Sequence, residues 1–154
     1  MNLSSENQAL IDSLVASIRQ VVPQTVTPGE AHPVEDAVAL NDIGVMVGIT
    51  GDFHGQVVLQ GGDAAFGQLG ASMFGMPLDG EMLHSFVGEL GNMVAGNAAT
   101  LVAGIGKRID ITPPAVMRGQ LQLYGFEQGF RIPLTLDPGG ELNLIVKIND
   151  QGVA

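Results

Sequence analysis

Residues 85–104 have the sequence SFVGELGNMVAGNAATLVAG, which is the strongest helical signal in the chain. Hydrophobic residues recur there at spacings of three and four, and this periodicity predicts an amphipathic helix. Asp79-Gly80-Glu81 supplies a start signal and Gly104 and Gly106 a stop signal, so we expect a helix from about 81 to 103. Its apolar stripe is expected to face a core and consists of Leu83, Val87, Leu90, Val94 and Leu101.

The opposite stripe of this helix is polar or small and consists of Ser85, Glu89, Asn92, Gly96 and Thr100. Glu89 and Asn92 lie three residues apart, so their side chains are expected to project side by side from one patch. Spacing alone leaves two interpretations open, an ordinary exposed surface or a functional pair. Each glycine inside the helix costs up to about 1 kcal/mol relative to alanine, and we expect tight packing or access for a partner to offset that cost.

The chain on either side of this helix alternates between helical and extended patterns. Before it we predict a helix over 5–22 that starts in a Ser5–Gln8 capping box, a loop over 23–33, a β-hairpin within 36–61 and a helix over 63–74. After it we predict extended segments over 107–118, 119–127, 129–136 and 140–148, with the turn DPGG (137–140) between the last two. Three helices and a largely antiparallel sheet predict an α+β fold, as one domain over residues 1–154.

The net charge limits the classes of molecule that this protein is expected to bind. The 154 residues include 6 Lys+Arg and 16 Asp+Glu, a formal net charge of −10. This composition argues against binding to nucleic acid or to an anionic membrane, because both need clustered basic residues. Arg19 is the one base among the first 106 residues, which hold eleven acids. These acids are interpreted either as a solvated face that keeps the protein soluble or as a face that meets a positively charged partner.

Metal, disulfide and targeting signals are missing from the sequence. Cysteine is absent, which excludes disulfides and thiolate metal sites. The histidines His32, His54 and His84 offer no i,i+4 pair, so we expect no metal ligands in this chain. No base precedes Arg19, unlike in a signal peptide, and no apolar run reaches the about 18–20 residues of a membrane span. We therefore expect a cytoplasmic protein.

Residues 85–104 closely resemble the helix signature of the CheC/CheX/FliY family of chemotaxis phosphatases, in which Glu-x-x-Asn is followed by Gly four residues later. The Gly96-Asn97 pair and the segment IDITPPAVMRG (109–119) resemble CheX-like members in particular. CheC-type members carry two such motifs, whereas ENQALIDSL (6–14) in the first predicted helix lacks Glu-x-x-Asn. The resemblance is strong from about residue 80 to 154 and rests on the order of elements before that.

The resemblance implies hydrolysis of the aspartyl phosphate on a CheY-like response regulator. Asn92 would orient the attacking water, and Glu89 would pair with the regulator's active-site lysine. Such a transfer needs mostly positioning and charge neutralisation, which a neutral amide and a carboxylate supply. Ser85 and Gly96 would lie in the partner contact. Mg²⁺ would be held by the regulator, so no cofactor is expected on this chain.

An alternative to the enzyme is a non-catalytic interaction domain on the same fold, in chemotaxis, flagellar or other two-component signalling. The FliM middle domain resembles this fold and lacks the motif, so the fold alone does not imply activity. The resemblance also implies a homodimer formed through sheet edges. Strands over 129–136 and 140–148 are expected to offer that edge.

Overall fold

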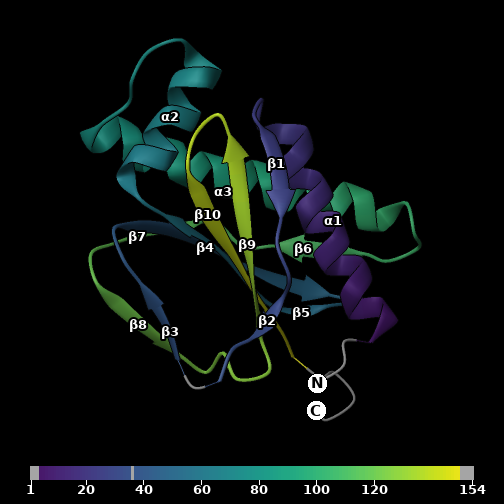
Figure 1. Cartoon of the computed structure of the whole chain (residues 1–154). Helices are drawn as coiled ribbons and strands as arrows, with labels where there is room; N and C mark the ends of the chain where they lie inside the picture. Colours follow the sequence, from purple (N-terminus) through teal and green to yellow (C-terminus); the bar gives the residue numbers. More distant parts are fainter. Residues whose placement is uncertain (1–3, 36, 150–154) are drawn as a thin grey trace.

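The fold is built around a curled antiparallel sheet, seen in a computed structural model that describes residues 4–35 and 37–149 (Figure 1). The helices are α1 (Ser5–Val21), α2 (Asp63–Phe74) and α3 (Gly80–Ala103). The strands are β1 (Thr25–Pro28), β2 (His32–Pro33), β3 (Ala37–Leu40), β4 (Ile43–Gly51), β5 (His54–Gly61), β6 (Ile109–Ile111), β7 (Ala115–Arg118), β8 (Leu121–Tyr124), β9 (Phe130–Asp137) and β10 (Glu141–Asn149). These elements confirm the predicted α+β fold.

The main sheet has the strand order β1-β9-β10-β5-β4-β6, with β2 also pairing with β9 and β7 with β4. Strands β4 and β5 form the predicted hairpin, in which Ile49 lies opposite Gly55. Helices α1 and α3 cover one face of this sheet (Figure 1). The main core lies between these helices and the strands, and it includes Leu14 and Ile18 of α1, Val87 and Leu90 of α3, and Val45 of β4.

The opposite face of the sheet carries a smaller second core. Among the described residues, strands β3 and β8 pair only with each other, and they lie apart from the helices (Figure 1). Val38 and Leu40 of β3 pack in one cluster with Val58, Phe126 and Ile145. Ile145 of β10 lies in this second core, whereas the adjacent residues Leu144 and Val146 of the same strand lie in the main core. Strand β10 is therefore buried on both faces. The predicted alternation in β10 is correct, but it accounts for only one of its two covered faces.

Two local predictions before residue 34 are wrong. Helix α1 is capped by Ser4, whose Oγ accepts a hydrogen bond from the Asn7 amide at 3.0 Å, and not by a Ser5–Gln8 box. Gln8 instead donates through its side chain to Asp12 at 2.9 Å. The predicted loop over 23–33 contains strands β1 and β2, both paired with β9. Their pairing partner lies about 100 residues away in sequence, so local pattern could not reveal it.

The strand edge predicted for dimer contact is also not available. Strand β9 lies between β1 and β10, and β10 lies between β9 and β5. Both strands over 129–136 and 140–148 are therefore internal to the sheet. Their alternating pattern reflects burial in the sheet and not an exposed edge.

Candidate functional site

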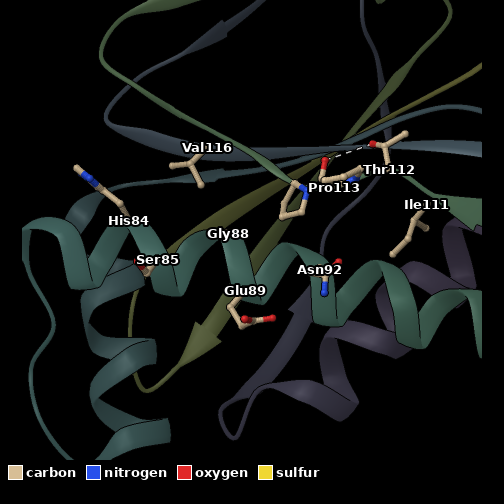
Figure 2. Close-up of a pocket in the computed structure, with 10 residues that line it drawn as sticks. His84, Ser85, Gly88, Glu89, Asn92, Ile111, Thr112, Pro113 and Val116 are labelled. Carbon is tan, nitrogen blue, oxygen red and sulfur yellow. Dashed lines mark hydrogen bonds between the residues drawn. The ribbon is translucent and has the colours of Figure 1, made fainter.

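Helix α3 presents Glu89 and Asn92 on its exposed side, as its periodicity predicts. The stripe opposite is buried, with Leu83, Val87, Leu90 and Val94 each at most 3% exposed, whereas Leu101 is only half-buried. Figure 2 shows the two polar side chains projecting from the helix. Across residues 4–35 and 37–149, neither side chain has a hydrogen-bond or ion-pair partner. Both groups are therefore free to engage another molecule.

Helix α3 is joined to α1 by one buried and one exposed polar contact. The Ser17 hydroxyl is fully buried and donates to the carbonyl oxygen of Val94 at 2.7 Å. Asn97 donates through Nδ2 to Oε1 of the exposed Gln20 at 2.8 Å. These two contacts with α1 help to orient the helix that carries Glu89 and Asn92.

An open groove runs beside the polar side of α3. Its residues come from the helix and from the β6–β7 segment: His84, Ser85, Gly88, Glu89, Asn92, Ile111, Thr112, Pro113, Pro114 and Val116. Figure 2 shows Thr112, Pro113 and Val116 alongside the helix. The predicted site residues Ser85, Glu89 and Asn92 therefore share one groove, whereas Gly96 lies one turn beyond it.

Thr112 helps to hold the far wall of this groove against β4, with which β6 and β7 also pair. The Gly48 amide donates to the Thr112 hydroxyl at 2.8 Å, and the Thr112 amide donates to the Gly48 carbonyl at 3.0 Å. A side chain at residue 48 would lie 3.0 Å from the Thr112 methyl group, so glycine allows this close approach. The sequence alone indicates no role for Thr112 or Pro113-Pro114, and the segment IDITPPAVMRG is the signal that points to them.

The glycines of α3 divide into two kinds. A Cβ at Gly91 would lie 2.7 Å from Cγ2 of Val45, and one at Gly88 would lie 3.1 Å from Cγ2 of Val116. These two glycines therefore permit tight packing against β4 and β7. A Cβ at Gly96 would meet nothing within 4 Å. Packing explains Gly88 and Gly91, whereas Gly96 leaves open space beside the site.

Charged side chains at the ends of α3 connect it to other elements. Near its start, Arg118 of β7 donates through Nε to Nε2 of His84 at 2.8 Å and forms an ion pair with Asp63 at 3.1 Å. After its end, Lys107 pairs with Glu6 of α1 at 2.5 Å. The hydrogen bond from Lys107 to Glu6 and the charge of that carboxylate raise the pKa of Lys107. His84 therefore belongs to a surface network with Arg118 and Asp63.

Two further observations concern metals and membranes. Within the described part of the chain, no three His, Asp or Glu side chains are grouped to hold a metal ion. Among the same residues, no helix combines the length and the apolar character that crossing a membrane requires.

Comparison with known proteins connects this site to a family. The model of the chemotaxis phosphatase CheX matches residues 43–135, a span that includes α3 and the wall of the groove. A relative from Thermotoga maritima, the CheY-P phosphatase CheX, is 30% identical over 148 residues, which cover 94% of this chain and 96% of the relative. The chain belongs to the CheX family of chemotaxis phosphatases. This result confirms the resemblance seen in residues 85–104 and 109–119.

Solved CheX structures have the same fold. A CheX protein from Desulfovibrio desulfuricans superposes with a TM-score of 0.77 at 18% identity, covering 92% of this chain and 97% of that one. A CheX–CheY–BeF3–Mg²⁺ complex from Borrelia burgdorferi gives a TM-score of 0.74 at 21% identity, covering 93% of this chain and 97% of that one. At these identities the structural likeness establishes the CheX fold.

Proposed function

We propose that this chain dephosphorylates a phosphorylated CheY-like response regulator, with Glu89 and Asn92 as its half of a composite active site. The observation that carries the proposal is the exposed, unpartnered pair of side chains on the rigid helix α3. Membership of the CheX family and the CheY-P phosphatase from Thermotoga maritima support the substrate class. The complex from Borrelia burgdorferi supports CheY as the kind of partner.

Asn92 positions the water that attacks the phosphorus atom. Its carboxamide oxygen accepts a hydrogen bond from the water, and its NH₂ group donates to a neighbouring acceptor. The new bond joins the water oxygen to phosphorus while the bond from phosphorus to the aspartyl oxygen breaks. The products are inorganic phosphate and the free aspartate of the regulator. A neutral amide does this without repelling the phosphoryl oxygens, which a second carboxylate would repel.

Glu89 orients the regulator by pairing with its active-site lysine. An exposed ion pair in water contributes little, but this pair becomes shielded from water when the two proteins meet. Ser85 and Gly96 flank the pair on the same side of α3 and contact the partner there. Mg²⁺ belongs to the regulator in this scheme, in keeping with the CheX–CheY–BeF3–Mg²⁺ complex from Borrelia burgdorferi. This chain therefore contributes positioning and charge, and no cofactor of its own.

The test compares the unmodified chain with Asn92→Ala on phosphorylated regulators from the same organism. We expect the variant to lose phosphatase activity by about 10²-fold, because the water is no longer held in line, while it still binds the regulator activated with beryllium fluoride. Phosphate release and the dissociation constant are measured separately. Gln68→Ala is the matched control, since it removes an exposed helical amide on α2 outside the groove.

Equal, near-spontaneous phosphate release with the unmodified chain and with Asn92→Ala would contradict the proposal. If binding persisted in that experiment, the chain would be a non-catalytic interaction domain on the CheX fold.

We further propose that the chain acts in the cytoplasm as a single domain that forms a homodimer. With β9 and β10 internal, the dimer contact must use another edge. Strands β3 and β8 pair only with each other among the described strands, and Tyr124 at the end of β8 is 74% exposed. A monomer in sedimentation analysis at micromolar concentration would contradict the dimer.

A further inference from the structure

We propose that a second groove, on the other side of Glu89, docks an apolar segment of the response regulator that is flanked by basic side chains. This inference rests on the proposed function and adds the surface that selects the partner. We define the methionine groove by its apolar residues, which come from the end of α2, the following loop and the start of α3: Phe74, Met76, Leu78, Met82 and Phe86. Glu81, Ser85 and Glu89 complete its lining.

The methionine groove gathers three exposed large apolar side chains at one place. Phe74, Met76 and Met82 are 61%, 50% and 55% exposed, although the floor residues Leu78 and Phe86 are buried. Large apolar side chains gathered at one place on a surface mark an interaction site more often than scattered ones do. Methionine adapts its shape to different partners, which suits a docking surface.

The methionine groove is held in shape by the packing beneath it. Phe74 and Phe86 meet edge to face, with ring centroids 5.8 Å apart and an interplanar angle of 89°. A Cβ at Gly70 would lie 2.4 Å from Cδ1 of Leu78, so α2 lies directly against the leucine that forms the floor. The packing of Leu78 and Phe86 against α2 therefore supports the exposed side chains of the methionine groove.

The methionine groove is continuous with the proposed active site. Ser85 and Glu89 line both this groove and the one that contains Asn92. Met82 precedes Glu89 by seven residues, or about 10 Å along the helix axis. A globular partner whose active site meets Glu89 and Asn92 therefore also covers Met82.

The charge around the methionine groove determines which partner fits. Asp79, Glu81 and Glu89 lie on or beside its rim, and none of its lining residues is Lys or Arg. Two copies of this face would bring acidic side chains together, which disfavours a second copy of the chain as the occupant. The complementary surface is apolar with Lys or Arg around it. A regulator that presents its active-site lysine to Glu89 already supplies one such base.

The test uses the double variant Met76→Ser/Met82→Ser with the beryllium-fluoride-activated regulator and with the phosphorylated regulator. We expect the dissociation constant and KM to rise about tenfold, while kcat stays within twofold of the unmodified value. Ile105→Ser is the matched control because Ile105 is 56% exposed in the turn after α3, at the far end of the helix. It should leave both constants unchanged.

Binding and turnover separate the two proposals. An unchanged dissociation constant in the double variant would overturn the docking site, whatever the rate of hydrolysis. Weaker binding by the double variant together with no hydrolysis by the unmodified chain would support the docking site and overturn the proposed function. A change in sedimentation with no change in the dissociation constant would assign the groove to a second copy of the chain and overturn the proposal.

Discussion

Glycine residues of α3 that look equivalent in the sequence occupy different environments. Gly91 lies against Val45 of β4, where a Cβ would approach within 2.7 Å of a methyl group. Gly96 faces open space one turn after Asn92. The same residue type is thus required by packing at one position, and at the other it leaves room that the partner is proposed to occupy.

Substituting these two glycines separates the two roles. We expect Gly91→Ala to destabilise the fold by about 1–3 kcal/mol, because the helix must move away from β4. We expect Gly96→Ala to stabilise it by up to about 1 kcal/mol, because alanine favours the helix and meets no obstacle. Chemical denaturation measures both changes.

The affinity for the regulator is the second measurement on the Gly91 and Gly96 variants. Gly96→Ala should weaken binding, since the added methyl group enters the proposed contact surface. Equal stability losses in the two variants would contradict the distinction between Gly91 and Gly96.

Among the elements, the groove beside Asn92 depends on the spacing between α3 and the β6–β7 segment. Thr112 contributes to that spacing through its two hydrogen bonds with Gly48, together with the pairing of β6 and β7 with β4. Pro113-Pro114, which form part of the groove wall, come directly after Thr112 in the sequence. Positioning of a water molecule tolerates little displacement, so the wall and the helix act as one unit.

Thr112→Val tests this unit. The substitution keeps the shape of the side chain and removes the acceptor for the Gly48 amide, which should lower the free energy of unfolding by about 1 kcal/mol. We also expect lower phosphatase activity, because the wall beside Asn92 loses one of the hydrogen bonds that join it to β4. Thr100→Val on the exposed end of α3 is the control. A loss of stability with unchanged activity would show that the wall has no part in the reaction.

At the scale of the whole molecule, negative charge is concentrated in the part of the chain that carries the site. Nine of the sixteen acids and none of the six basic residues fall between Arg19 and Lys107, the part of the sequence that contains Glu89 and Asn92. A field of one sign steers an oppositely charged partner and speeds its association. The acidic face is therefore interpreted as part of partner recognition and not only as a means of solubility.

Salt dependence of association checks this interpretation. We expect the association rate with the activated regulator to fall about tenfold between about 50 and 500 mM salt, with a smaller change in the dissociation rate. Stopped-flow mixing measures both rates. An association rate that does not change with salt would show that the acidic residues serve solubility alone.

Features that depend on local periodicity can be predicted from the sequence alone. The helix over Gly80–Ala103, its buried stripe and the exposed pair Glu89 and Asn92 all follow from a repeat of 3.6 residues, and the hairpin of β4 and β5 follows from alternation. The family resemblance likewise rests on two contiguous segments of sequence, residues 85–104 and 109–119.

Contacts between distant residues could be seen only in the folded structure. It paired β1 and β2 with β9, set Thr112 against Gly48 beside Asn92, and gathered Phe74, Met76 and Met82 next to Glu89. It also distinguished Gly91 from Gly96 and left β9 and β10 without a free edge. Contacts between segments far apart in the chain leave no periodic trace in either segment, because the packing of the whole fold determines them.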